Sequence, residues 1–386
     1  MNQKNISFRT IRVSLLLLLG VAIVAFSSRI MASPVPQLTA QMNTEPQVQT
    51  TDPMQVQPEG RNPPWAPDID PQMLAVVEQL TAFKAPPYTE LTAEQAREVP
   101  TATDAVMEIL RKTGLPPMPA AVDIAHQVIP GPTTEGVLVR TYTPLQGNGP
   151  FPVIVYYHGG GWVIANLNTY DPSARALAEK TGAVVVSVAY RQAPEHQFPA
   201  AHEDAFAAYR WAVENAGRIN GDPNRVAVAG ESAGGNLAVA VALIARERDV
   251  KLPAHVLSVY PIADGDTESP SYQQYADAKP LNRPLMQWFF DKYLGNPDDA
   301  QSPLISLVNA NLSGLPPTTI INAEIDPLRS EGEELAQLMR KAGVPVEQQT
   351  FRGVTHEFFG MASVLEQAVR AQDFAVRRLG ETFGRE

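Results

Sequence analysis

Gly230-Glu231-Ser232-Ala233-Gly234 is a G-x-S-x-G stretch between a strand pattern and a helix pattern. The residues before it, 225–229, form a short apolar run of strand type, and residues 235–242 after it are apolar and rich in alanine, as in a buried helix. A serine at such a strand-to-helix turn exposes its Oγ at the top of an α/β sheet. The flanking glycines avoid collisions that a Cβ would make with the neighbouring strand or helix. The stretch therefore predicts a nucleophile elbow; the plainer alternative is a glycine-rich turn that contains a serine.

A base and an orienting acid follow this serine in the chain. Both are needed to activate a serine hydroxyl, and behind this kind of elbow they come in the order Asp or Glu, then His. Asp326 follows the apolar stretch 318–323, which is typical of a buried strand, and open α/β sheets place their sites at such strand ends. Of the six histidines only His356 follows Asp326. Ser232, Asp326 and His356 are therefore the candidate nucleophile, acid and base.

A glycine loop, His158-Gly159-Gly160-Gly161-Trp162, comes directly after the apolar stretch 153–157. Successive glycines allow backbone N–H groups to turn toward a developing oxyanion without obstruction by side chains. A phosphate-binding loop is the competing interpretation, but no Gly-Lys-Ser/Thr sequence follows. His158 precedes the serine, so we expect it to fix the loop by hydrogen bonding rather than to act as the base.

Four motifs in this order carry a resemblance to a known family. The hormone-sensitive-lipase-like esterases, which are the bacterial family IV carboxylesterases, have similar motifs in the same order, and the likeness runs from about Pro71 to the C-terminus. A further similar stretch lies at 190–201, between the glycine loop and the elbow. The four motifs are HGGGW at 158–162, GESAGG at 230–235, DPLRSEG at 326–332 and THEFFG at 355–360.

The resemblance implies a role for each site residue. Ser232 would be the nucleophile, Asp326 the acid and His356 the base of a serine carboxylesterase that needs no cofactor. The oxyanion hole would consist of three backbone N–H groups, with His158, Gly159 and Glu231 as supporting motif residues. The three N–H groups are those of Gly160, Gly161 and Ala233.

Three points of the site remain open in the sequence. Glu324 is a rival acid because it stands two residues before Asp326 on the same face of an extended segment, although the D-P-L resemblance favours Asp326. Glu231 and Ser330 stand where the family usually has Asp. Glu231 lengthens the side chain next to the nucleophile, and Ser330 is expected at a helix start, as an N-cap-type residue.

The function that these motifs predict is hydrolysis of short- to medium-chain carboxylic esters through an acyl-enzyme. The alternatives are a lipase acting on longer acyl esters and a non-catalytic scaffold that binds a small molecule. A metal site is not expected, because His356-Glu357 begins like H-E-x-x-H but Gly360 stands where the second histidine is needed. The net charge of −11 and the lack of a basic cluster argue against nucleic acid as a partner.

The N-terminal segment is predicted to be a targeting signal. Lys4, Arg9 and Arg12 precede an apolar run at 13–26, which is shorter than the roughly 20 residues that span a membrane, and small residues follow. We expect residues 1–32 to be a signal peptide that directs export; an uncleaved signal anchor, with membrane association through this segment, is the alternative. Residues 33–70 are rich in Pro and Gln and are predicted to be a disordered linker.

An α/β-hydrolase fold with a helical cap is the predicted architecture. Helices over 71–83 and 103–111 precede the first strand pattern, so they are not expected in the sheet. The resemblance implies that such helices form a cap, and residues 71–120 are therefore assigned to an N-terminal cap and 121–386 to the catalytic domain. A cap insertion is expected at about 263–300, where the aromatic-rich stretch 285–294 serves either the cap or the core. The mostly parallel sheet has eight expected strands, with an antiparallel start: 122–128, 136–143, 153–157, 184–189, 225–229, 256–260, 318–323 and 346–351. Oligomeric state is not readable from the sequence.

Overall fold

The computed structural model describes residues 56–114 and 121–384, which belong to one compact unit. The predicted signal segment 1–32 and the first part of the predicted linker, 33–55, lie outside the described residues. Both therefore stay predictions. Within the described ranges, no helix is long and apolar enough to span a membrane.

One sheet of eight strands forms the centre of the described part of the chain, in the order β1-β2-β4-β3-β5-β6-β7-β8. The β1–β2 and β2–β4 pairs are antiparallel, and every later pair is parallel. This confirms the predicted mostly parallel eight-stranded sheet with an antiparallel start. The strands are β1 (Val122–Ile129), β2 (Val137–Pro144), β3 (Phe151–Tyr157), β4 (Val184–Ala189), β5 (Gly221–Glu231), β6 (Val256–Val259), β7 (Thr318–Ile325) and β8 (Val346–Thr355).

Five strands are longer than the apolar pattern predicted, and the difference is largest in β5 and β8. β5 begins at Gly221 rather than at residue 225, because the backbone of Gly221 pairs with Phe151 although the residues between are polar. β8 continues past residue 351 to Thr355, which pairs with Ile325. Backbone pairing does not require apolar side chains, so the hydrophobic pattern underestimates both strands.

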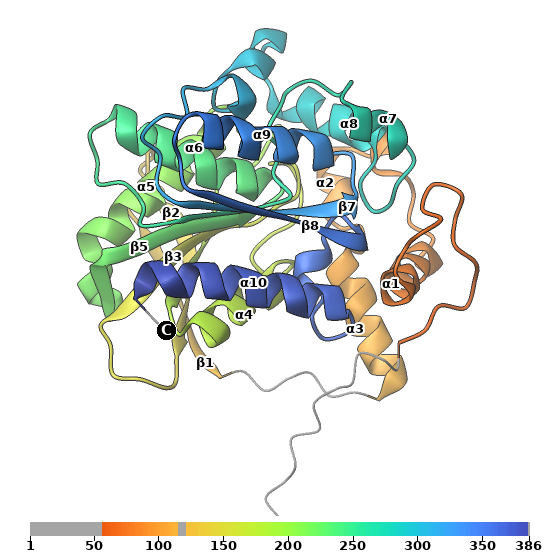
Figure 1. The fold of residues 1–386 in the computed structure, drawn as a ribbon, viewed down its shortest axis with the longest axis horizontal. Coiled ribbons are helices and arrows are strands. Elements are labelled where there is room, and N and C mark those ends of the chain that lie inside the picture. The colour runs from red at the N-terminus through yellow and green to blue at the C-terminus, as the bar shows by residue number, and fades with distance from the viewer. Residues whose placement is uncertain (1–55, 115–120, 385–386) are drawn as a thin grey trace, which may run out of the picture. The chain divides into compact units, whose positions relative to one another are not determined.

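Helices cover both faces of the sheet, as Figure 1 shows. Parallel sheets are usually buried on both sides, which explains why β3 and β4 read as nearly continuous apolar runs. Successive side chains of β3 alternate between two core clusters, Val153 and Val155 in one and Ile154 and Tyr156 in the other. The first cluster lies under α5 (Ala200–Asn215), α6 (Ala233–Glu247) and α9 (Arg329–Lys341), and the second under α4 (Asp171–Thr181) and α10 (Glu366–Phe383).

Two further groups of helices have members at the end of the sheet toward which β7 and β8 point (Figure 1). One group, which is called the N-terminal cap below, precedes β1, and the other lies between β6 and β7. Capping residues begin several of them: the Asp70 carboxylate accepts from Gln72 N–H at 2.8 Å, and the Asn282 side chain accepts from Leu285 N–H at 2.9 Å. The groups are α1 (Pro71–Ala82), η2 (Tyr88–Glu90), α2 (Ala93–Ala96) and α3 (Ala102–Thr113), then α7 (Pro270–Gln274), α8 (Arg283–Tyr293), η4 (Pro297–Gln301) and η5 (Leu307–Asn309).

Residues 56–70 correct the C-terminal end of the predicted linker. Val56, Ala66 and Ile69 are buried in the core cluster that contains α1. The N–H groups of Glu59 and Gly60 both donate to the Glu78 carboxylate at 2.8 Å. A few spaced apolar side chains and one carboxylate are enough to order this stretch, although its composition is typical of a linker.

Candidate active site

The turn between β5 and α6 has the geometry of a nucleophile elbow. Ser232 adopts φ 59° and ψ −120°, a region that is costly for a residue with a Cβ. Its N–H donates to Val259 O at 2.9 Å, which ties the turn to β6. A Cβ on Gly234 would overlap the carbonyl oxygen of Tyr157, so glycine is required where α6 passes over β3. The plainer interpretation of a simple glycine-rich turn does not explain this strained backbone.

Two hydrogen bonds join the three residues that the chain order selected. His356 Nε2 lies 2.9 Å from Ser232 Oγ, and His356 Nδ1 lies 2.7 Å from Asp326 Oδ2. All three side chains are buried, with at most 4% of each residue exposed. Because an ionised carboxylate only accepts, Nδ1 carries the imidazole proton, and Nε2 is left as the acceptor for the serine hydroxyl. Burial lowers the pKa of His356, but the nearby carboxylates, Asp326 above all, outweigh it and raise that pKa above its ordinary value.

The rival acid Glu324 lies elsewhere. Its carboxylate accepts the backbone N–H of Gly353 at 2.8 Å, at the end of the sheet formed by β7 and β8. Asp326 also accepts the N–H of Leu328, through Oδ1 at 2.9 Å, which fixes its second oxygen toward the imidazole. Of the two candidates left open by the sequence, the structure brings Asp326 to His356.

Gly160 and Gly161 of the glycine loop line the same cavity as Ser232, and Ala233 directly follows the serine at the start of α6. Gly160 and Gly161 have φ values of 95° and 58°, and a Cβ on Gly161 would overlap the Phe289 ring. Across residues 56–114 and 121–384, no protein acceptor pairs with the N–H groups of Gly160, Gly161 or Ala233. Donors left free at such a place can bind an oxyanion.

His158 makes its hydrogen bonds with this loop and with Tyr190. Burial lowers the pKa of His158 to about 4, so the ring is neutral at physiological pH. Its Nδ1 lies 2.8 Å from Gly159 O, and the Tyr190 hydroxyl donates to His158 O at 2.8 Å. The two rings stack with centroids 4.3 Å apart. No hydrogen bond links His158 to Ser232 within the described residues.

Glu231, the first departure from the family motif, has two tyrosine partners. Its two carboxylate oxygens accept the hydroxyls of Tyr156 and Tyr260. The Tyr260 ring in turn packs on the His356 imidazole, with centroids 4.5 Å apart. Burial raises the pKa of Glu231 to about 7, although the hydroxyl donors oppose that shift. The longer side chain therefore joins the residue before the nucleophile to the ring that packs on the histidine.

Ser330, the second departure, corrects the N-cap expectation. It lies inside the first turn of α9, whose N-cap is Leu328. Its Oγ accepts Ser271 N–H at 3.1 Å, and its N–H donates to Ser271 Oγ at 3.0 Å. This reciprocal pair joins α9 to α7, so Ser330 connects the inserted helices to the catalytic body instead of capping its own helix.

Glu357 is a second acidic neighbour that the sequence reasoning missed. It directly follows His356 with φ 71°, and its Oε1 lies 3.9 Å from His356 Nε2. The Tyr170 hydroxyl donates to the same oxygen at 2.5 Å. Burial raises the pKa of Glu357. No motif points to Tyr156, Tyr170 or Tyr260, because they come from segments distant in sequence from the carboxylates that they contact.

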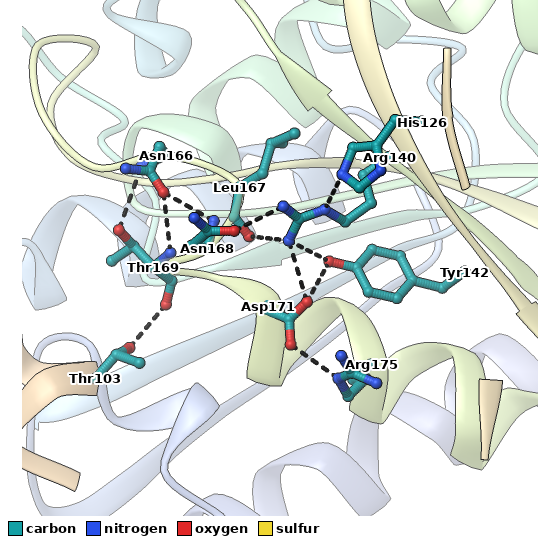
Figure 2. A network of polar contacts seen from close by, with 10 residues as sticks. All are labelled: Thr103, His126, Arg140, Tyr142, Asn166, Leu167, Asn168, Thr169, Asp171 and Arg175. Carbon is teal, nitrogen blue, oxygen red and sulfur yellow. Dashed lines mark hydrogen bonds and ion pairs between the residues drawn. The ribbon is translucent and has the colours of Figure 1, made fainter. Parts of the chain in front are cut away.

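The segment that carries Tyr170 is held by a polar network, shown in Figure 2. Arg140 of β2 donates to Asn168 Oδ1 at 2.6 Å and to Asp171 Oδ1 at 3.2 Å. From the N-terminal cap, the Thr103 hydroxyl donates to Thr169 O at 2.7 Å. The network therefore fixes one wall of the site and links α3 to it.

A cavity of about 500 Å³ opens onto Ser232 and His356. Both cap groups contribute to its wall, including Leu80 and Tyr88 from the N-terminal group and Leu285 and Phe289 from α8. The aromatic stretch of α8 serves the cap and the core together, since Tyr293 stacks on the buried Trp162 with centroids 4.5 Å apart. In the part of the chain that the structure describes, no cluster of His, Cys, Asp or Glu side chains is arranged to hold a metal ion.

Comparison with known proteins gives consistent matches. Residues 154–360 match the family model described as alpha/beta hydrolase fold, and this range contains all four motifs. Carboxylesterase NlhH of Mycobacterium tuberculosis is 38% identical over 312 residues, which cover 79% of this chain and 93% of that protein. The ethyl acetate hydrolase of Pseudomonas putida is 36% identical over 60% of this chain and 74% of its own. The solved structure of a hyperthermophilic esterase from the archaeon Pyrobaculum calidifontis has a TM-score of 0.73 and 36% identity, covering 81% of this chain and 98% of that one.

Proposed function

The chain belongs to the hormone-sensitive-lipase-like carboxylesterases of the α/β-hydrolase superfamily and is a carboxylic ester hydrolase, and on that premise we propose that Ser232, His356 and Asp326 form its catalytic triad. The observation that carries the proposal is the continuous pair of hydrogen bonds from Ser232 Oγ through His356 to Asp326. This is the arrangement that activates a serine as a nucleophile.

The reaction proceeds through a covalent acyl-enzyme. Ser232 Oγ attacks the ester carbonyl carbon while its proton passes to His356 Nε2, and the carbonyl oxygen becomes an oxyanion. When the tetrahedral intermediate collapses, the C–O bond to the alcohol breaks, and the alcohol leaves with the proton from His356. Water then attacks the acyl carbon, gives a proton to His356, and releases the carboxylic acid as Ser232 recovers its proton. Asp326 stays ionised and stabilises the imidazolium.

The oxyanion is held by three backbone donors in this proposal. The N–H groups of Gly160, Gly161 and Ala233 have no other protein acceptor in the described ranges, so they are free for the charge that develops on the carbonyl oxygen. Removing one donor of this kind costs roughly 2.7–4 kcal/mol of transition-state stabilisation in well-studied hydrolases.

Short- to medium-chain carboxylic esters are the proposed substrates. The cavity of about 500 Å³ is lined mainly by apolar side chains of the cap, which suit a small acyl or alkoxy group better than a long acyl chain. The similar protein named ethyl acetate hydrolase agrees with a small ester. No cofactor takes part, because the serine, the histidine and water supply every group that is transferred.

Turnover of p-nitrophenyl esters with acyl chains of two to sixteen carbons tests both parts of the proposal. We expect kcat/KM to be highest at the short and medium chains and Ser232→Ala to abolish turnover, whereas the exposed control Ser313→Ala keeps it. Highest activity at the longest chains would favour a lipase. Turnover that survives in Ser232→Ala contradicts the mechanism, and a wild-type protein that neither turns over esters nor reacts with an organophosphate at Ser232 would be a binding scaffold.

Export is a separate proposal. We infer that residues 1–32 direct export and are removed, on the basis of three cationic residues followed by an apolar run too short to span a membrane. N-terminal sequencing of the protein purified from its source tests this. A new N-terminus near residue 33 is expected, and an intact Met1 would indicate a retained anchor instead.

A further inference from the structure

The carbonyl groups of residues 162–165, where the glycine loop ends, each accept a hydrogen bond. The loop turns back at residues 162–165, where Trp162 and Ala165 both have positive φ, 60° and 65°. Such a turn persists only when its surroundings hold it. The donors come from two segments, residues 192–193 and Arg97: Ala193 N–H to Trp162 O at 2.9 Å, Arg97 Nε to Val163 O at 2.9 Å, and Gln192 Nε2 to Ile164 O at 2.8 Å and Ala165 O at 3.0 Å.

Arg97 makes the central contact and belongs to the N-terminal cap, at the C-terminal end of α2. Besides Val163 O, its guanidinium donates to Ala193 O at 2.7 Å and to both oxygens of Glu195 at 2.8 and 2.7 Å. One rigid group thus bridges the two segments that meet behind the glycine loop. A lysine has a single ammonium on a flexible stem and cannot reproduce this fork.

The contact at Val163 bears on the oxyanion donors through one peptide unit. The N–H groups of Val163 and Ile164 both donate to Gly160 O, at 3.0 and 2.9 Å. Gly160 C=O and Gly161 N–H belong to the same planar peptide, and in a trans peptide they point in opposite directions. Whatever fixes the Gly160 carbonyl therefore also fixes the direction of the Gly161 N–H.

We propose that Arg97 of the cap is a positioning residue for the oxyanion hole, acting through Val163 and the Gly160–Gly161 peptide. This inference rests on the proposed function, since it concerns the N–H groups that would stabilise the oxyanion. It makes the cap part of the catalytic geometry as well as a wall of the cavity. Loss of the Arg97 contacts frees the turn at 162–165 to relax, which rotates the Gly161 N–H away from the oxyanion position.

The part of the N-terminal cap that lines the cavity is also held by hydrogen bonds that do not involve Arg97. Residues 99–102 line the cavity just after Arg97, and the next residues are held by the Thr101–Asp104 capping box and by the Thr103 hydroxyl on Thr169 O. Substrate binding should therefore depend on Arg97 less than turnover does. The Glu195 side chain is 54% exposed, so its ion pair contributes little by itself, and the contacts to the two carbonyls are the ones that matter.

Steady-state kinetics on p-nitrophenyl butyrate separate positioning from binding. We expect Arg97→Ala to lower kcat about tenfold to a hundredfold with KM changed less than about threefold, because a displacement of roughly 1 Å at a catalytic group costs up to about a hundredfold. Arg97→Lys should lose most of the same activity, and Glu195→Gln much less. Arg111→Ala is the matched control, since Arg111 makes a bidentate pair with Glu108 on α3, with both distances 2.7 Å, and does not contact the glycine loop.

Inhibition constants distinguish a positioning role of Arg97 from a purely structural one. A trifluoromethyl ketone adds to Ser232 and places an oxyanion in the hole, whereas butyrate does not form a tetrahedral adduct. The Ki of the ketone should rise in parallel with the loss of kcat, and the Ki of butyrate should stay within about threefold of the wild type.

Two results overturn the inference: a folded Arg97→Ala with kcat within twofold of the wild type, or a fall in kcat without any rise in the ketone Ki. If Arg97→Ala does not fold by circular dichroism, Arg97→Lys decides by the same criteria. If the proposed function itself is wrong, the wild type and Arg111→Ala do not turn over the ester either. That result is distinguishable from a failure of the Arg97 inference, which appears only in the Arg97 variants.

Discussion

Replacing Glu231 with glutamine should change the pH dependence of stability in a defined direction. Burial raises the pKa of this carboxyl from 4.5 to about 7, so the folded protein keeps Glu231 protonated at pH values where the unfolded chain has already ionised it. Below pH 4.5 the group is protonated in both states and has no effect on stability. As the pH rises from 4.5 to about 7, the wild type loses stability from this group, and above that pH the loss is complete. Glutamine does not ionise, so the variant escapes the loss.

The size of the effect follows from the shift. A rise in the pKa of Glu231 from 4.5 to about 7 corresponds to roughly 3 kcal/mol of lost stability at high pH. Most of this change develops between about pH 5 and about pH 8. Lost hydrogen bonds to Tyr156 and Tyr260 lower the stability of the variant by an amount that does not depend on pH in this range, because both hydroxyls have raised pKa values. The change with pH therefore isolates the buried carboxyl.

Urea unfolding followed by tryptophan fluorescence, at several pH values across that range, measures the difference in unfolding free energy between Glu231→Gln and the wild type. The difference should move in favour of the variant as the pH rises. Glu195→Gln is the control, because the Arg97 hydrogen bond lowers the pKa of that carboxyl to about 2, and its effect on stability is lost only in more acidic solution. A Glu231→Gln difference that stays constant with pH, or that moves the other way, would refute the reasoning.

Three further predictions concern activity. Burial lowers the pKa of His356, and the carboxylates of Asp326 and Glu357 raise it. Glu357→Gln removes one of these two carboxylates, so the acid limb of kcat/KM should move to lower pH. An unchanged midpoint in the pH profile would contradict this. Gly161→Ala should reduce kcat by about a hundredfold or more, since the new Cβ overlaps the Phe289 ring and displaces an oxyanion donor; wild-type kcat would exclude the assigned hole. Phe289→Ala should enlarge the cavity and raise the octanoate-to-butyrate ratio of kcat/KM several-fold, and an unchanged ratio would place the acyl group elsewhere.

The positions of Ser232, Asp326 and His356 were accessible from the sequence for a physical reason. Each follows a strand pattern, and parallel strands bring their carboxyl ends to one edge of a sheet. Chain order and strand ends were therefore enough to predict that Ser232 and His356 meet and that the acid comes from the strand end after residue 323, even where strand limits were short by several residues. The choice between Asp326 and Glu324 was harder, because both lie at the same strand end. The D-P-L resemblance favoured Asp326, and hydrogen bonds that no strand pattern indicates distinguish the two: Glu324 accepts Gly353 N–H, whereas Asp326 accepts Leu328 N–H and binds His356.

Order in residues 56–70 was missed because composition averages over a segment, whereas burial depends on where single side chains lie. There are few apolar residues here, but each of the three, Val56, Ala66 and Ile69, is buried in the core cluster that contains α1. Backbone N–H groups of the segment find the Glu78 carboxylate nearby. A stretch can thus be linker-like in composition and still have the burial and the hydrogen bonds that order it.

Glu231 shows which part of a site can be derived from one residue and which part requires the strand order. The structure buries Glu231, and a buried carboxylate needs donors. Once its burial is known, the residue type alone implies that partners exist. It does not predict Tyr156 and Tyr260, because these come from the ends of β3 and β6, and a strand buried on both faces carries no alternation that shows which tyrosine turns toward the elbow. The partners follow only from the strand order, in which β5 lies between β3 and β6, so the motif and the topology must be known together before the role of Glu231 can be derived.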